Sequence, residues 1–466
     1  MPRPAQLTPT DLTLRFQVDG ALTAQALADR LGVTQPTISR GLGRLGDSVV
    51  ALGAARRTRY ALRRTVRAAG DRWPIYRVDA NGRAREWARL HALHGGYWVE
   101  WAGTPPAWAE HALDREGHVA GFPFFLGDLR PQGFLGRNVA RRIAEALRLP
   151  ADPRAWGDDD TLVFLQAEGD DLPGDLIVGE APLRRLQARV LAANDDDVVP
   201  ERARATRYPA LAAQAAAGAA AGSSAGGEQP KFLTALRGRD GAVRHVLVKF
   251  SPPTDTPAGR RWADLLTAEA HALAVLAEHG LATAGARTLD AEGRRFLEVT
   301  RHDRIGAHGR RGVVSLEALH GDLGAGAPTD WAASVEGMAR AGHVDEAGLG
   351  AVRRQHAFGE LIGNSDMHFG NLAFWLDDAV PFRPTPAYDM LPMAWAPNAQ
   401  GEVVERAFAP RAPLPGALPA WSEAAGWAED FWQRVAADAE VSRDFRAHAR
   451  AAGAVVARLR EHFGPA

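Results

Sequence analysis

The sequence contains no cysteine among its 466 residues. Disulfide bonds, iron–sulfur clusters, thiolate metal sites and a cysteine nucleophile are therefore excluded. Long apolar runs are also missing, because the longest stretch of small apolar residues, 211–222, is mostly alanine and too short to cross a bilayer. The first residues show no basic segment followed by an apolar one, so no signal peptide is expected. We expect a cytoplasmic protein with no membrane partner.

Lysine is almost absent as well. Of the 55 basic side chains, only Lys231 and Lys249 are lysine, and all the others are arginine. A lysine is a compact charge on a thin stem, whereas a guanidinium group is a wide planar fork. Positions 231 and 249 are therefore candidates for sites where arginine could not replace lysine. The alternative is that the two lysines are present by chance.

The charged residues are unevenly distributed along the chain. Residues 1–70 carry 11 Arg and 4 Asp, a net charge of +7, so the other residues must sum to −8 for the total of −1. A basic N-terminal segment on an acidic body indicates a local site for a polyanion.

Residues 1–65 have the pattern of a winged helix-turn-helix. A helix is expected over 23–31, and a second helix begins after Thr34, which would cap it. Two short strands, 49–52 and 58–62, should enclose a basic wing. Side chains of the second helix and of the wing are predicted to contact duplex DNA: Gln35, Thr37, Ser39, Arg40, Arg44, Arg56 and Arg57. The alternative is a small helical domain that binds protein.

Three further segments are expected, over 66–208, 209–345 and 346–466. The first is mixed, and its acidic cluster 158–160 is interpreted as a solvated loop. An Ala/Gly/Ser-rich stretch, 209–227, is typical of a flexible linker when taken alone. Strands and helices are expected downstream at 231–236, 243–250, 262–279, 295–301, 354–362, 372–375, 383–388 and 421–463.

Polar residues near position 370 have the spacing of a kinase catalytic loop. Asp366 is followed five residues later by Asn371, and Asp389 lies after the next expected strand. In kinases, the first Asp accepts the proton of the substrate hydroxyl, and the Asn and second Asp bind Mg²⁺. Two alternatives remain, an Asx-rich turn and a His/Asp metal site for hydrolysis.

A lysine and a glutamate upstream fit the same interpretation. Lys249 ends an expected strand, and Glu269 lies on the following helix, as in the pair that orients nucleotide phosphates in kinases. The alternative is a surface lysine and a solvated glutamate. The glycine-rich stretch 222–231 could approach phosphates through its backbone, although it lacks P-loop spacing.

Taken in order, these motifs resemble the HipA family of bacterial serine/threonine kinases, the toxins of toxin–antitoxin systems. The resemblance covers roughly residues 70–450 and is most specific at 363–372. It implies an α+β fold: a two-lobed, protein-kinase-like body with a mainly helical C-terminal lobe, here preceded by the winged helix-turn-helix. The segment 209–345 would be the N-lobe and 346–466 the C-lobe.

The resemblance also assigns roles to residues. Asp366 would be the catalytic base with His368 supporting its loop, Asn371 and Asp389 would bind Mg²⁺, and Lys249 would contact ATP phosphates. The hinge beside adenine would include Thr300 and His302, which replace the acidic and aromatic residues expected there. Ser223 matches the position of the autophosphorylated serine, although Glu228 is one residue too many in this loop, which leaves Ser224 open.

We therefore expect an Mg-ATP-dependent protein serine/threonine kinase with an autoregulatory DNA-binding head. The resemblance suggests an aminoacyl-tRNA synthetase as protein substrate and an antitoxin as partner. The alternatives are a transcriptional regulator whose kinase-like body is an inactive sensor, and a metal-dependent phosphohydrolase.

Overall fold

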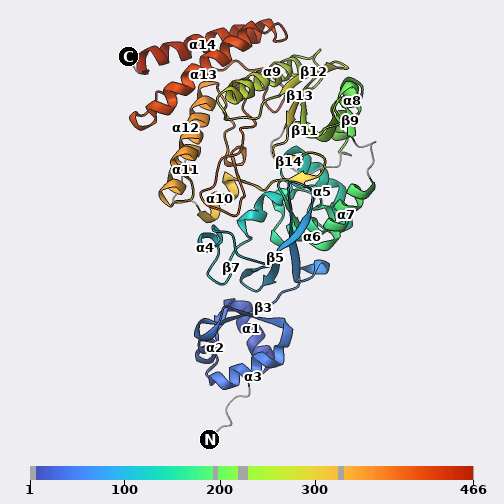
Figure 1. Cartoon of the computed structure of the whole chain (residues 1–466), viewed down its shortest axis with the longest axis vertical. Helices are drawn as coiled ribbons and strands as arrows, with labels where there is room; N and C mark the ends of the chain where they lie inside the picture. The colour runs from blue at the N-terminus through green and yellow to red at the C-terminus, as the bar shows by residue number, and fades with distance from the viewer. Residues whose placement is uncertain (1–6, 193–197, 219–228, 324–329, 465–466) are drawn as a thin grey trace.

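The computed structural model describes residues 7–192, 198–218, 229–323 and 330–464. Figure 1 shows an elongated molecule with a small N-terminal head at one end, a middle domain, and a two-lobed body whose C-terminal helices lie farthest from the head. Helices and strands alternate in no regular order, so the expected α+β class is confirmed.

The head contains three helices and an antiparallel sheet of strand order β1-β3-β2. Its elements are α1 (Pro9–Asp19), β1 (Leu22–Thr23), α2 (Ala24–Leu31), α3 (Gln35–Leu45), β2 (Val49–Leu52) and β3 (Arg59–Leu62). The two expected helices and two expected strands are present, whereas α1 has no counterpart in the sequence prediction. Thr34 stands at the N-cap of α3, but its hydroxyl contacts that of Thr37 at 3.0 Å and does not cap the backbone, which corrects the expected capping.

Ion pairs fasten the head to the middle domain. Arg64 contacts Asp159 at 2.6 Å, and Arg67 pairs with Asp160. The acidic cluster Asp158–Asp160 was expected in a solvated loop and instead begins helix α6 (Asp158–Glu168). Carboxylates are favoured at a helix N-terminus, where they face unpaired backbone N–H groups.

The middle domain is an antiparallel sheet of order β7-β6-β5-β4-β8 with helices packed beside it. The strands are β4 (Arg72–Val78), β5 (Ala84–Leu93), β6 (Gly96–Trp101), β7 (His118–Val119) and β8 (Leu176–Val178). The helices are α4 (Ala109–Ala112), α5 (Gly133–Leu147), α6 and α7 (Glu180–Ala192), with a 3₁₀ segment, η4 (Phe124–Leu129), before α5. Trp87 and Trp108 lie in its core.

A second sheet, of order β12-β13-β11-β10-β9, forms the first lobe of the body. Its strands are β9 (Val198–Pro200), β10 (Lys231–Arg237), β11 (Val243–Phe250), β12 (Arg287–Ala291) and β13 (Arg294–Thr300), and its helices are α8 (Arg204–Ala216) and α9 (Pro257–Glu278). Helix α8 runs across the boundary expected at 208/209 and occupies the start of the stretch interpreted as a linker. The division into 66–208, 209–345 and 346–466 otherwise stays a prediction.

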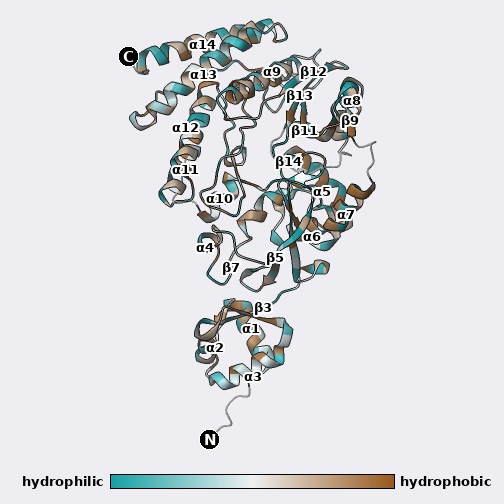
Figure 2. Cartoon of the chain, in the orientation of Figure 1, coloured by the Kyte–Doolittle hydropathy of each residue, from teal (hydrophilic) through white to brown (hydrophobic). Residues whose placement is uncertain are grey.

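The second lobe is mainly helical. It contains α10 (Leu316–Leu323), α11 (Trp331–Arg340), α12 (Glu346–Leu361), α13 (Leu418–Ala437) and α14 (Arg443–Phe463), and the strand pair β16 (Val313–Ser315) and β17 (Ala373–Trp375). In Figure 2, α13 and α14 carry hydrophilic and hydrophobic residues along their whole length, as amphipathic helices do. No helix in the described part of the chain is long and apolar enough to cross a membrane.

Two expectations for this lobe are wrong. The strand expected over 383–388 is absent apart from an isolated bridge at Pro384, because Pro384 and Pro386 have no N–H to donate to a ladder. The single helix expected over 421–463 is two helices. They are separated at 438–442, where Ser442 caps α14 by accepting the N–H of Phe445.

Candidate active site

A cleft lies between the second sheet and the helical lobe, and the middle domain closes one side of it. Its polar lining comes from all three parts: Lys231, Lys249, Glu269, Thr300, Arg301, His302, Asp303, Ser315, His368, Asn371, Tyr388, Asp389, Asp128 and Gln132. The cleft therefore brings together seven of the eight residues predicted to act in catalysis, nucleotide binding or metal binding. The eighth, Asp366, is exposed outside this lining.

Lys249 lies at the centre of the polar end of the cleft. Its Nζ donates to both carboxylate oxygens of Glu269, at 2.6 and 2.7 Å, and also to Asp389. Lys249 is 3% exposed and Glu269 is 1% exposed. Burial raises the pKa of Glu269, with a smaller contribution from Asp389. Burial alone would lower the pKa of Lys249, but Asp389 and Glu269 raise it above its ordinary value.

Lys231 is a functional candidate that sequence analysis did not assign. It lies on β10 directly opposite Lys249 on β11, so both side chains share one face of the hairpin. Lys231 is 1% exposed, and its charge helps lower the pKa of Asp389. The signal was present, because Lys231 and Lys249 are the two lysines of the chain and the turn at 238–241 joins their strands.

Hydrogen bonds hold the loop that carries Asp366. The side chain of Asn371 donates to the Asp366 carbonyl at 2.8 Å, and Asn364 accepts from the Asp366 N–H at 3.1 Å. The His368 ring accepts from the Gly370 N–H at 3.1 Å, a contact within this loop. Although Asp366 is exposed, neighbouring protein atoms partly shield its carboxyl group from water, and this raises its pKa. A carboxylate whose proton affinity is raised accepts a proton more readily, which suits a general base.

The backbone at Asp389 has a φ of 52°, in the left-handed region that a non-glycine residue rarely adopts. Asn364 donates to the Asp389 carbonyl at 3.2 Å and helps hold this conformation. Strained backbone of this kind often fixes a functional side chain. Here it directs the carboxylate toward Lys249.

The side chains of Asn371 and Asp389 suit a magnesium ion that is bound by the protein and by phosphate oxygens of a substrate together. Mg²⁺ prefers oxygen ligands and is usually held by one or two carboxylates together with water and phosphate oxygens. The described residues contain no group of three or more His, Asp or Glu side chains placed to hold a metal alone. This donor set therefore suits a metal that arrives with a polyphosphate better than a metal held by protein alone.

The opposite end of the cleft is formed by the segment after β13. His302 packs against Trp375 and Tyr388, with ring centroids 5.4 and 5.9 Å apart, respectively. Burial lowers the pKa of His302, so the ring is neutral at physiological pH. Thr300 lines the cleft beside it. Two neutral side chains and packed rings suit an uncharged flat group such as a nucleobase.

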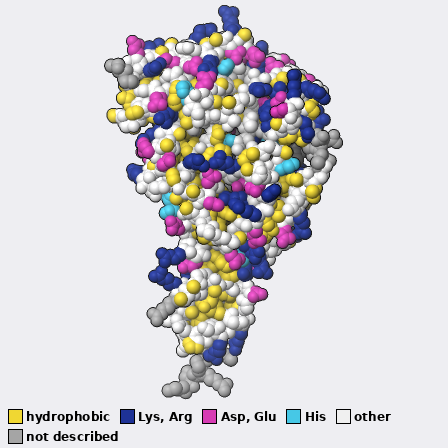
Figure 3. Space-filling model, viewed as in Figure 1, with side chains coloured by type: hydrophobic (Ala, Val, Ile, Leu, Met, Phe, Trp, Pro, Cys, Tyr) yellow, Lys and Arg dark blue, Asp and Glu magenta, His cyan; other side chains and the backbone are white. Residues whose placement is uncertain are grey.

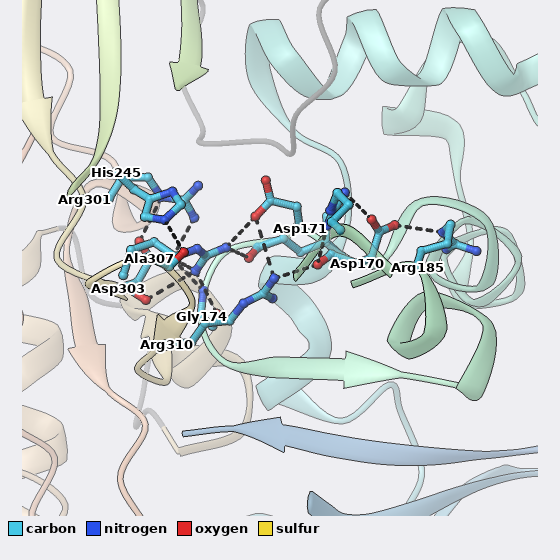
Figure 4. Close-up of polar contacts among 12 residues, drawn as sticks. Asp170, Asp171, Gly174, Arg185, His245, Arg301, Asp303, Ala307 and Arg310 are labelled. Atoms are coloured by element: carbon cyan, nitrogen blue, oxygen red, sulfur yellow. Dashed lines mark hydrogen bonds and ion pairs between the residues drawn. The ribbon is translucent and has the colours of Figure 1, made fainter. Parts of the chain in front are cut away.

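An ion network joins this segment to the middle domain (Figure 4). Arg301 pairs with Asp303 at 2.8 Å, and Arg304 contacts both Asp303 and Asp171, at 2.7 and 2.9 Å. The Gly174 N–H donates to Asp303 at 2.9 Å. Burial alone would raise the pKa of Asp303, but its arginine neighbours hold it far below the usual range. The end of the cleft opposite the lysines is thus joined to the middle domain by ion pairs and a hydrogen bond.

The predicted DNA contacts lie in the head, away from the cleft (Figure 1). Gln35, Ser39, Arg40 and Arg44 are exposed on α3, and Thr37 is half-buried. Arg57 is exposed in the turn between β2 and β3. The side chain of Arg56, and both Ser223 and Ser224, lie outside the described residues.

Two family descriptions match the chain. Residues 69–187 match the middle domain of YjjJ-like toxins, and residues 223–462 match the HipA-like C-terminal domain. Toxin YjjJ of Escherichia coli (strain K12) is 38% identical over 440 residues, which cover 94% of each chain.

Among solved structures, the fold is similar to a complex of Shewanella oneidensis HipA, HipB and operator DNA. The TM-score is 0.50 at 15% identity, covering 84% of this chain and 97% of that one, so this likeness shows the fold alone. The expected family is confirmed by the matched domains and by the curated relative. The chain belongs to the HipA family, among its YjjJ-like toxins.

Proposed function

We propose that the chain is an Mg-ATP-dependent kinase that phosphorylates serine or threonine on protein. The observation that carries this is the buried Lys249–Glu269 pair in one cleft with Asn371 and Asp389, next to the loop of Asp366. Phosphoryl transfer depends mainly on positioning and on stabilising charge, and these residue types perform both tasks in kinases.

Each residue has a role in this proposal. Lys249 and Lys231 bind phosphate oxygens, and Glu269 holds Lys249 in place. Asn371 and Asp389 bind Mg²⁺, which neutralises phosphate charge when it is bound. Asp366 takes the proton from the substrate hydroxyl, and its exposure suits a base that must reach a second protein. His368 keeps the loop in shape.

The proposed target and partners of the chain are based on the similar proteins named above. The curated relative is named a toxin, and the solved HipA was found with HipB and operator DNA. We propose a protein target whose phosphorylation arrests growth, with an aminoacyl-tRNA synthetase as the candidate implied by the family, and an antitoxin as a further partner.

The test is incubation of the purified full chain with γ-labelled ATP and Mg²⁺. A kinase transfers label to protein. Label released only as free phosphate would point to a phosphohydrolase, and ATP that binds but is not consumed would favour a transcriptional regulator with an inactive sensor body. Either result would contradict the proposed function.

We also propose that the head binds duplex DNA as a winged helix-turn-helix. Its order of elements supports this, with α3 as the recognition helix and the β2–β3 turn as the wing. Arg59, Arg64 and Arg67 pair with carboxylates of the middle domain, so the basic groups of α3 remain on the outer end. Figure 3 shows basic side chains at this end of the head.

Alanine at Arg40, Arg44 or Arg57 should weaken DNA binding in a salt-dependent way. Each lost phosphate contact should lower the slope of log K against log salt by about 0.9. Fluorescence anisotropy over a range of salt concentrations measures this, with Arg89→Ala, on β5 of the middle domain, as the matched control. Binding that does not depend on salt, or no binding at low salt, would indicate a protein-binding head.

Ser223 is expected to be phosphorylated by the chain itself, which should switch off its activity. A phosphate adds a charge of about −1.5 to −2 at pH 7. Since its loop leads into β10, which carries Lys231, that charge would repel nucleotide or hold the loop away from the site. Phosphosite mapping of Ser223→Ala and Ser224→Ala identifies the residue. Phosphate on neither serine, in a preparation that phosphorylates another protein, would exclude this regulation.

A further inference from the structure

Asp128 of the middle domain reaches into the cleft and is held rigidly there. Its two carboxylate oxygens accept from the backbone N–H and the hydroxyl of Ser315, at 2.5 and 2.6 Å. Ser315 ends β16 and pairs with Ala373 of β17, two residues after Asn371. Asp128 is therefore fixed to the floor of the cleft, although it comes from a different part of the chain.

The surroundings of Asp128 place it between the two ends of the cleft. The Tyr388 ring packs on His302 at one end, and its hydroxyl donates to the Gly370 carbonyl at 2.9 Å toward the other. Asp128 and Tyr388 line the same cleft, and Ser315, which binds Asp128, pairs with Ala373 on the strand that follows Gly370. A nucleotide whose base lies at His302 and whose phosphates lie at Lys249 has its sugar between them.

The chemistry of the Asp128 carboxylate determines which part of a nucleotide it can bind in the cleft. Both oxygens of Asp128 act as acceptors, because the N–H and the hydroxyl of Ser315 donate to them, and each oxygen has a lone pair left after this bond. Phosphate oxygens are also acceptors and carry like charge, so Asp128 would repel them. Sugar hydroxyls are donors, and acidic residues bind ribose hydroxyls in other nucleotide folds.

We propose that Asp128 accepts hydrogen bonds from the ribose hydroxyls of the nucleotide, so that the middle domain selects ribonucleotides over deoxyribonucleotides. The proposal rests on the nucleotide site proposed above. It makes Asp128 a specificity-determining residue supplied from outside both lobes.

The test is isothermal titration of the full chain with Mg²⁺ and three ligands: ADP, 2′-deoxy-ADP and 3′-deoxy-ADP. ADP avoids the complication of phosphoryl transfer. Because hydrogen bonds to charged groups are among the stronger ones, at least one deoxy form should bind at least about tenfold more weakly than ADP. Asp128→Asn keeps the size and one acceptor oxygen for Ser315 and should bind all three equally. Asp255→Asn, the same change at an exposed position after β11, should retain the preference for ADP.

The outcomes distinguish the proposed role of Asp128 from the proposed nucleotide site on which it depends. Equal binding of all three nucleotides by the wild-type chain, or an unchanged preference in folded Asp128→Asn, would overturn the role of Asp128 and leave the nucleotide site standing. Loss of the preference in Asp255→Asn as well would also overturn that role, because the effect would not be specific to Asp128. No binding of any of the three would overturn the nucleotide site itself.

Discussion

Asp389→Asn should lower the rate of phosphoryl transfer by about 100- to 1000-fold, the range seen when one preorganised electrostatic contact in an active site is lost. The substitution removes the only carboxylate in the proposed metal-ligand set and leaves Lys249 with Glu269 as its remaining ion-pair partner in the cleft. Mg²⁺ dependence should weaken with the rate. The measurement is initial rate against Mg²⁺ concentration at saturating ATP.

Asp366→Ala should behave differently, because Asp366 is proposed to act on the substrate hydroxyl and not on the nucleotide. Transfer should fall by about 100- to 10,000-fold, the contribution of a positioned acid or base, while ADP binding stays unchanged. Asp255→Ala is the matched control, since Asp255 is exposed in the segment after β11. If both active-site variants keep wild-type rates, the kinase assignment is wrong.

A further large effect is expected for Lys249→Arg, although this substitution conserves the charge. Nζ contacts three carboxylate oxygens in a space where the lysine side chain is 4% exposed. A guanidinium group is wider than an ammonium group and would have to displace Glu269 or Asp389. We expect transfer to fall by about 100-fold.

Arg239→Lys provides the control for this exchange, because Arg239 is exposed in the β10–β11 turn and should tolerate the change without loss. Calorimetric unfolding of both variants separates a local effect from a general loss of fold. A fully active Lys249→Arg would mean that lysine survives at this position by chance, and that its pairing with Glu269 does not serve catalysis.

The parts of the site that the sequence predicts are those carried by local spacing. The hairpin of β10 and β11, the helix with Glu269 and the loop from Asp366 to Asn371 each have a strand or helix pattern within about ten residues of the functional side chain. Such patterns depend on hydrogen bonds and periodicity near in sequence, so a single sequence can show them.

The contacts of the middle domain with the cleft could not be predicted from local sequence patterns. Asp128 reaches the cleft only because η4 packs against β16, which lies nearly two hundred residues downstream. Asp171 and Arg304, which also contact each other, are 133 residues apart in the sequence. No local pattern encodes such contacts, since they arise from tertiary packing. The strand expected over 383–388 is absent for a local reason, because Pro384 and Pro386 have no N–H to donate to a ladder.

Intact-protein mass spectrometry after incubation with Mg-ATP tests the central claim most directly. The wild-type chain should gain the mass of a phosphoryl group, Asp366→Ala should not, and both should bind ADP. A wild-type chain that stays unmodified and transfers no phosphate to any added protein, while it binds or hydrolyses ATP as Asp366→Ala does, would contradict the account.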